Sequence, residues 1–242
     1  MNDHLQGILP IGCNLSLIQV FSMLPTHYLN TAGEHPFVIE GQAGQLEGIF
    51  TVPEKARTDY LAVLGHPHSL QGGSMNNKVV TTLARLFKEL AVPSIRFNFR
   101  GVGQSAGLYD HGIGESEDML SIARQYKEQI SPVNFIFAGF SFGSYVAYRT
   151  AAQHEHALLI TVAPPVHHYD YTEYDPVPTP WILVQGDDDD VVPLQFVLDF
   201  AARLKPSISV LRFPETGHFF HGRLLELKSG LLELVRRQVP TL

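Results

Sequence analysis

The chain has a single cysteine, Cys13, among its 242 residues. One cysteine excludes an internal disulfide, and it also excludes a metal site built from several cysteines. A low cysteine content is typical of proteins from reducing compartments. We therefore predict a cytoplasmic protein that is stabilised by a hydrophobic core, for which a chain of this length is sufficient.

Positive charge is also scarce. The chain has 17 Lys and Arg against 24 Asp and Glu, a formal net charge of −7, and the basic residues form no cluster. Proteins that bind nucleic acid usually present a basic surface to the phosphate backbone. The charge balance therefore argues against a nucleic-acid partner.

The first 35 residues contain no Lys or Arg, although Ile8 to Leu24 is largely apolar. A signal peptide needs a basic start, and Pro10 and Asn14 interrupt the apolar run. The run is also too short and too broken to cross a membrane. We predict that residues 1–35 are an N-terminal extension that does not bind a membrane. The sequence leaves open whether this extension is ordered and whether Met23 is the true start.

No repeat, linker or low-complexity run interrupts the rest of the chain, which alternates between apolar strands and helices. Residues 37–52 predict two antiparallel strands. The later strands are expected at residues 60–65, 94–99, 134–138, 157–163, 181–185 and 208–213. The helices are expected at residues 77–90, 115–129, 144–153, 194–204 and about 219–237. This alternation predicts the α/β class, with a mostly parallel, doubly wound sheet in a single domain over residues 36–242.

The most informative motif is Gly139-Phe140-Ser141-Phe142-Gly143, which lies where a predicted strand gives way to a predicted helix. A serine on so sharp a turn has a strained backbone, and its hydroxyl is pushed out of the sheet. Side chains two positions to either side would collide as the strand and the helix fold back on each other. We predict that Ser141 is a nucleophile.

A serine hydroxyl needs a base to accept its proton, and the base needs an orienting group. After an elbow serine, the acid is expected before the histidine in the chain. The run Asp187-Asp188-Asp189-Asp190 follows one predicted strand, and Gly217-His218 follows the last one. Both segments are strand-end loops, where ligands of such sheets bind.

With these motifs in place, the chain from about Phe37 onward resembles the α/β-hydrolase superfamily. It is most similar to small capless bacterial hydrolases related to dienelactone hydrolases and serine-peptidase-like acyl hydrolases. Their acid loop reads Gly-x-x-Asp-x-x-Val-Pro, so the resemblance implies that Asp189 is the acid. Their histidine loop implies that His218 is the base. The rival candidates are Asp187, Asp188, Asp190 and, for the base, His221.

Attack by the serine creates an oxyanion that two backbone N–H groups should stabilise. One donor is expected from Phe142, the residue after the nucleophile. The other is expected from the loop that begins His66-Pro67-His68. Because proline has no N–H, we assign the second donor to His68.

Two other readings of the polar motifs are less favoured. His66 and His68 form a His-x-His pair, but no further metal ligand accompanies them. Arg100-Gly101-Val102-Gly103 has glycines but lacks the spacing of a phosphate-binding loop. The resemblance implies that it is a structural turn. We predict that the protein needs neither a metal nor a cofactor.

The connection between Ala163 and Trp181 is short, and many relatives insert a cap at this point. Without a cap, the site should be open and suited to a small acyl substrate. Aromatic residues in 167–171 are expected either to line the acyl pocket or to cover the surface. We predict a serine carboxylesterase that acts through an acyl-enzyme. A peptidase or thioesterase with the same triad, or a non-catalytic ligand-binding member of the fold, remain the alternatives. The sequence predicts no oligomeric state.

Overall fold

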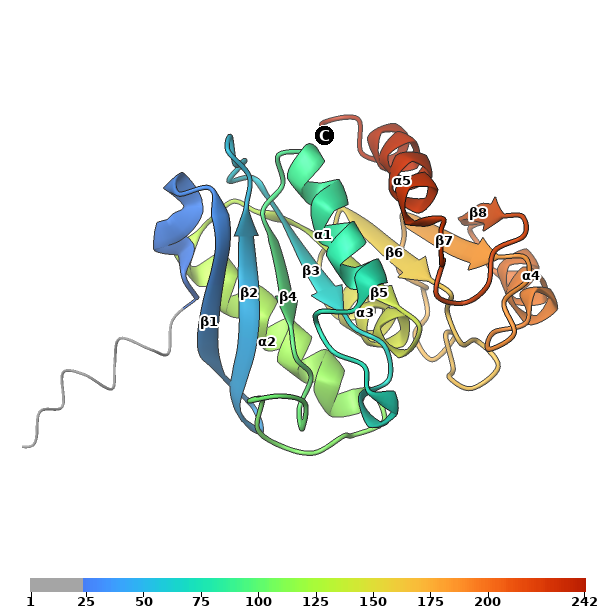
Figure 1. The fold of residues 1–242 in the computed structure, drawn as a ribbon, viewed down its shortest axis with the longest axis horizontal. Coiled ribbons are helices and arrows are strands. Elements are labelled where there is room, and N and C mark those ends of the chain that lie inside the picture. Colours follow the sequence, from blue (N-terminus) through green and yellow to red (C-terminus); the bar gives the residue numbers. More distant parts are fainter. Residues whose placement is uncertain (1–23) are drawn as a thin grey trace, which may run out of the picture.

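Eight strands form one sheet in the order β1-β2-β4-β3-β5-β6-β7-β8 (Figure 1). The computed structural model describes residues 24–242, so the predictions for Cys13, the apolar run before Leu24 and a start at Met23 lie outside the described residues. Within the described part, no helix is both long enough and apolar enough to cross a bilayer.

The first two strands are antiparallel to their neighbours, and the rest of the sheet is parallel. The strands are β1 (Gly33–Gly41), β2 (Gly44–Val52), β3 (Tyr60–Gly65), β4 (Ser94–Phe97), β5 (Asn134–Phe140), β6 (Leu158–Val162), β7 (Trp181–Gly186) and β8 (Ser209–Phe213). The parallel strands read as continuous apolar runs because helices bury them on both faces. The carboxyl ends of the parallel strands lie along one edge of the sheet, and the loops that follow them place polar side chains there.

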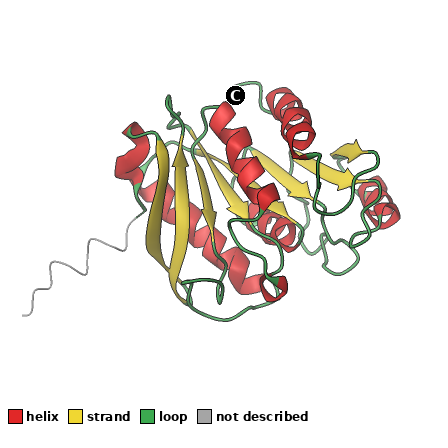
Figure 2. Cartoon of the chain, viewed as in Figure 1, coloured by secondary structure: helices red, strands yellow, loops and turns green. Residues whose placement is uncertain are grey.

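Helices cover the sheet on both sides (Figure 2). The helices are α1 (Lys78–Glu89), α2 (Ile113–Gln129), α3 (Phe142–Ala152), α4 (Leu194–Arg203) and α5 (Leu224–Gln238). Figure 1 shows α1 and α5 in front of the sheet and α2 and α3 behind it. Each face has its own core: α1 and α5 pack on one set of strand side chains, and α2, α3 and α4 pack on the alternate set.

The structure confirms the predicted α/β alternation and shifts some boundaries. β1 begins at Gly33 rather than at Phe37, because Gly33–Pro36 continue the pairing with the end of β2. The last helix begins at Leu224 rather than near Phe219. Phe220 and Gly222 have φ angles of 52° and 74°, a left-handed conformation that an α-helix does not admit.

The connection between β6 and β7 adds no layer over the site. Residues 163–180 contain turns and bends but no helix or strand. Tyr171 from this connection is fully buried, and its hydroxyl lies 2.7 Å from Ser144 Oγ at the start of α3. The connection therefore packs against the start of α3 and contains no helix that could cap the sheet.

Candidate active site

Ser141 lies on the turn between β5 and α3. Its φ and ψ are 52° and −123°, a conformation that residues with a side chain rarely adopt. The Ser141 N–H donates to the Val162 carbonyl at 2.8 Å, which ties the turn to β6. The Ser141 carbonyl accepts from the Ser144 N–H at 2.9 Å, so that α3 begins at once. The strained turn predicted from the motif is present.

The glycines around Ser141 allow three backbone segments to touch. A Cβ on Gly139 would lie 2.0 Å from the Gly143 carbonyl oxygen. A Cβ on Gly143 would lie 2.4 Å from the Gly65 carbonyl carbon and 2.4 Å from the His66 oxygen. These contacts are with backbone atoms, which cannot rotate away. The glycine spacing thus permits the close approach of β5, α3 and the end of β3.

Ser141, His218 and Asp189 are joined by hydrogen bonds although they are far apart in the chain. His218 Nε2 lies 3.1 Å from Ser141 Oγ. His218 Nδ1 lies 2.9 Å and 3.1 Å from the two carboxylate oxygens of Asp189. His218 is 4% exposed, and the Asp189 side chain is fully buried. An Nδ1–H held by a buried carboxylate leaves Nε2 free to accept a proton from the serine.

Backbone and side-chain donors hold the Asp189 carboxylate in place. Its Oδ1 accepts from the Val191 and Val192 N–H groups at 3.0 Å and 2.7 Å. Its Oδ2 accepts from Gln185 Nε2 at 3.1 Å. Gln185 is also fully buried and donates to the Val192 carbonyl at 2.9 Å. The sequence analysis did not identify Gln185. The signal that points to it is a single amide side chain at the end of an apolar strand, directly before an acidic run.

The rival candidates have other surroundings. Asp187 forms a two-pronged ion pair with Arg212, with both contacts at 2.9 Å. Asp188 and Asp190 are exposed, as is His221. Among residues 24–242, Asp189 is the carboxylate that contacts His218.

His66 fixes the loop after β3. Its Nδ1 lies 2.6 Å from the Pro67 carbonyl, and its Nε2 accepts from the Phe99 N–H at 2.9 Å. Burial lowers the pKa of His66 to about 4, so the ring is neutral at neutral pH. Because backbone groups engage both ring nitrogens, His66 has no lone pair to offer a metal ion. Within the described part of the chain, no group of three His, Cys, Asp or Glu side chains is arranged to hold one.

The Arg100–Ser105 segment forms a turn that is fixed by polar contacts. Arg100 donates to the two carboxylate oxygens of the buried Asp118 at 2.8 Å and 2.9 Å. Glu47 Oε1 accepts from the Gln104 N–H at 2.7 Å. The polar groups of this segment are thus hydrogen-bonded to other residues of the protein, as expected for a structural turn.

The two predicted oxyanion donors lie beside Ser141. Phe142 is the first residue of α3, where the helix supplies no carbonyl partner for the N–H. The His68 carbonyl accepts from the Gln71 and Gly73 N–H groups, both at 3.0 Å, so the loop turns tightly at this residue. His68 and Ser141 line the same hollows. The assignment of both amides as oxyanion donors stays a prediction.

Two hollows meet at Ser141. The smaller, about 160 Å³, is lined by Pro67, His68, Gln71, Gly72, Gly73, Asn77, Ser141, Val191, His218 and Phe219. The larger, about 410 Å³, is lined by His68, Gln71, His111, Ser141, Phe142, Pro165, His168, Tyr169 and Val191. Neither lining contains Asp, Glu, Lys or Arg. Burial lowers the pKa of His68 and raises that of Tyr169, which favours the uncharged form of each. The hollows therefore suit uncharged groups.

The chain is similar to two solved structures of α/β serine hydrolases and to one further bacterial protein. No protein-family model matches the chain. The chain is 42% identical to an α/β serine hydrolase homologue from Coxiella burnetii, with a TM-score of 0.79 over 83% of this chain and 97% of that one. It is 39% identical to an α/β serine hydrolase without a lid from Xanthomonas campestris, with a TM-score of 0.83 over 90% and 98% of the two chains. An uncharacterised protein of Rickettsia prowazekii is 32% identical over 202 residues, 79% of this chain and 84% of that protein.

The chain belongs to the α/β serine hydrolases, and its fold is the α/β-hydrolase fold without a cap domain. The family and the fold class predicted from the sequence are confirmed.

Replacement of each aspartate in the run 187–190 tests which carboxylate orients His218. Asp189→Asn should lower kcat by roughly four orders of magnitude, because an amide favours the wrong tautomer of His218. Asp187→Asn, Asp188→Asn and Asp190→Asn are matched controls, and each should cost less than about tenfold because these carboxylates do not contact the histidine. Steady-state turnover of a p-nitrophenyl ester measures all four variants. A crippling loss in one of the controls with Asp189→Asn active would move the acid to that position.

The glycine at the start of α3 provides a second test. Gly143→Ala should destabilise the protein by about 1–3 kcal/mol or more, because the new methyl group overlaps backbone atoms. Gly230→Ala in α5 is the control: its Cβ would be 3.4 Å from the nearest side-chain atoms, and alanine favours a helix by up to about 1 kcal/mol. Urea unfolding measures both. Equal stability of the two variants would contradict the close approach at Ser141.

Proposed function

We propose that this protein hydrolyses the carboxylic esters of small substrates through an acyl-enzyme. The observation that carries the proposal is the hydrogen-bonded chain at the elbow, with His218 Nε2 3.1 Å from Ser141 Oγ and His218 Nδ1 2.9 Å from Asp189. A serine in contact with a histidine that is oriented by a buried carboxylate is equipped for acyl transfer. Ser141, His218 and Asp189 are thus assigned as nucleophile, general base and orienting acid.

The reaction proceeds in two halves. Ser141 Oγ attacks the ester carbonyl while His218 Nε2 takes its proton, and a tetrahedral oxyanion forms. Collapse of this intermediate breaks the bond to the alcohol, which leaves with the proton from His218. A water molecule then attacks the acyl carbon while His218 Nε2 takes its proton. The bond between the acyl carbon and Ser141 Oγ breaks, His218 returns the proton to Oγ, and the carboxylic acid leaves. Asp189 stabilises the imidazolium in each half.

The amides of Phe142 and His68 are assigned to the oxyanion. Helix α3 begins at Phe142, so its N-terminal partial positive charge also faces the developing negative charge. His66 ties the loop that carries His68 to the end of β4, because its Nδ1 contacts the Pro67 carbonyl and its Nε2 accepts from the Phe99 N–H. A positioned N–H donor raises the reaction rate most when the negative charge that it stabilises forms only in the transition state.

The two hollows are assigned to the two sides of the scissile bond. The larger one is flanked by Phe142 and Tyr169 and accepts the acyl group, and the smaller one, next to His218, accepts the alcohol. The alcohol leaves from the side of the histidine that must protonate it, which supports this orientation. Because the linings carry no formal charge, neutral acyl groups are preferred over anionic ones.

Loss of the nucleophile tests the proposal directly. Ser141→Ala should lower ester turnover by about four orders of magnitude or more while circular dichroism stays that of the wild type. A fluorophosphonate probe should label the wild-type protein and not the variant. Normal turnover by a folded Ser141→Ala protein would refute the assignment, and failure of the wild type to be labelled would favour the ligand-binding alternative.

The preferred length of the acyl chain should depend on how much of the chain the hollow at Ser141 can cover. Burial of a methylene is worth about 0.8 kcal/mol, but chain atoms beyond the hollow remain in water and gain little. We expect kcat/KM for p-nitrophenyl esters to peak at about two to six acyl carbons and to fall for longer chains. Thioesters and peptide amides of matched acyl groups, assayed in parallel, compare the alternative leaving groups. An optimum at long chains, or a rise in rate above the solubility limit of the substrate, would contradict the open site.

A further inference from the structure

Aromatic rings line the larger hollow at Ser141. Five of its nine lining residues carry a ring, namely His68, His111, Phe142, His168 and Tyr169. They come from four places in the chain: the loop after β3, the segment between β4 and α2, the start of α3 and the connection after β6. The acyl-transfer steps proposed above use the backbone amides of two of these residues and none of the rings.

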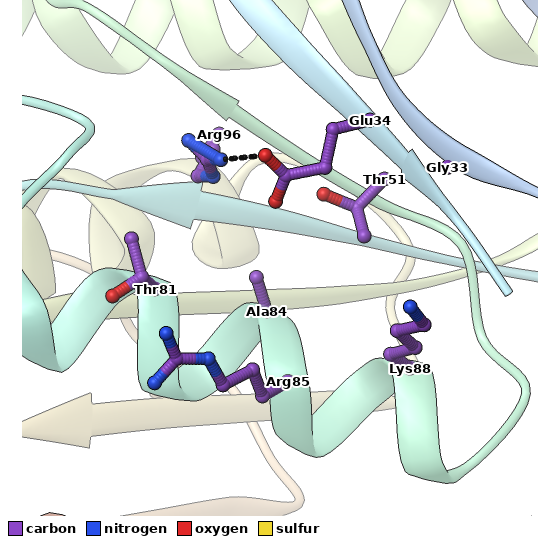
Figure 3. A pocket seen from close by; sticks show the side chains of 8 residues that line it. All are labelled: Gly33, Glu34, Thr51, Thr81, Ala84, Arg85, Lys88 and Arg96. Atoms are coloured by element: carbon purple, nitrogen blue, oxygen red, sulfur yellow. Dashed lines mark ion pairs between the residues drawn. The ribbon is translucent and has the colours of Figure 1, made fainter.

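This lining is not a general property of the cavities of the protein. A pocket of the same volume, about 410 Å³, lies between α1 and the strands β1, β2 and β4, away from Ser141 (Figure 3). None of its eight lining residues is aromatic, and four are charged: Glu34, Arg85, Lys88 and Arg96. Figure 3 shows Arg96 paired with Glu34, a contact of 2.8 Å. The rings are therefore gathered at the site of the reaction.

Phe142 and Tyr109 support the rings that meet the hollow. Phe142 is 1% exposed, and its ring centroid lies 5.1 Å from that of His68 and 5.6 Å from that of Tyr169. The Tyr109 ring lies 4.8 Å from His68, and its hydroxyl lies 3.3 Å from that of Tyr169. The half-buried rings of His68 and Tyr169 thus belong to one packed aromatic wall.

Tyr169 has one ring face available to a ligand. The Tyr145 ring stacks on it, with a centroid distance of 4.6 Å and an interplanar angle of 25°, and covers the other face. Tyr169 is half-buried and lines the hollow, so that it meets a ligand with its free face or its edge. The face of an aromatic ring is partly negative and its edge partly positive, which favours offset or edge-to-face contact with a second ring. A saturated ring has no such charge pattern.

We infer that the larger hollow selects an aromatic acyl group, with the Tyr169 ring as the specificity-determining contact. This rests on the proposed function, in which the larger hollow accepts the acyl group. A phenyl ring close to the carbonyl is compact and stays beside the aromatic wall, whereas a linear chain with as many carbons extends into water. The volume of the hollow lies in the range of small-molecule sites, and its lining carries no Asp, Glu, Lys or Arg.

Three p-nitrophenyl esters test the selection: the phenylacetate, the cyclohexylacetate and the octanoate. They share the leaving group, the number of acyl carbons and a methylene next to the carbonyl, and the hydroxide-catalysed rate of each corrects for intrinsic reactivity. We expect the corrected kcat/KM of the phenylacetate to exceed the other two by about two- to tenfold. The assay is run at mildly alkaline pH, where an ordinary imidazole is uncharged. Equal or lower kcat/KM for the phenylacetate would overturn the inference.

Variants of the connection after β6 test the role of Tyr169. Tyr169→Leu keeps an apolar side chain and removes the ring, so the ratio of phenylacetate to cyclohexylacetate turnover should fall to near one. Tyr169→Phe keeps the ring and should keep the ratio. Tyr174→Leu is the matched control, because Tyr174 is a half-buried tyrosine of the same connection that packs on Tyr148 outside the hollow. An unchanged ratio in folded Tyr169→Leu, or an equal fall in Tyr174→Leu, would refute the role of Tyr169.

Failure of the aromatic selection can be separated from failure of ester hydrolysis. Turnover of all three esters at similar corrected rates would leave the hydrolytic function in place and contradict the selection. If no ester is turned over, the proposed function fails, and binding to Ser141→Ala decides the selection without chemistry. Isothermal titration of that variant should then show tighter binding of phenylacetamide than of cyclohexylacetamide, again by about two- to tenfold. Equal affinity for the two amides would overturn the inference.

Discussion

The active site depends on the close contact of three backbone segments at Gly65, Gly139 and Gly143. Each Cβ added there would lie within 2.7 Å of a backbone atom of another segment. The contact lets α3 start directly at the end of β5, so the turn between them must be sharp and Ser141 takes a positive φ. This backbone conformation costs of order 1–3 kcal/mol, and the packing of the strands and of α3 around the turn offsets that cost. From that one turn follow the exposure of the hydroxyl and the direction of the first N–H groups of α3.

The partners of the serine are fixed by buried polar contacts rather than by the turn. The Asp189 carboxylate has the Val191 and Val192 N–H groups, Gln185 and His218 around it. Each such bond contributes about 0.5–1.5 kcal/mol net, or somewhat more with a charged partner, but an unpaired carboxylate there would be far more costly. These hydrogen bonds hold the Asp189 carboxylate in position beside His218. His66 does the same for the loop after β3, as a neutral ring between two backbone groups.

The sequence alone predicted the features that depend on local pattern. The glycine spacing indicated the turn at Ser141, the alternation of strands and helices indicated the fold class, and the resemblance singled out Asp189 within the aspartate run. It did not predict features that depend on contacts between distant segments. Gln185 reads as the last residue of an apolar strand until the acid loop folds over it. The late start of α5 at Leu224 likewise depends on left-handed residues that no local pattern required.

The central claim is that Ser141 carries the acyl group during turnover, and mass spectrometry of the quenched enzyme tests it most directly. The protein is mixed with excess p-nitrophenyl acetate, quenched with acid within the first turnover, digested and sequenced. The account predicts an acetyl group on the peptide that contains Ser141, with the amount of early nitrophenol matching the amount of enzyme. Turnover without acetylation of Ser141, or acetylation at another residue that keeps pace with catalysis, would contradict it.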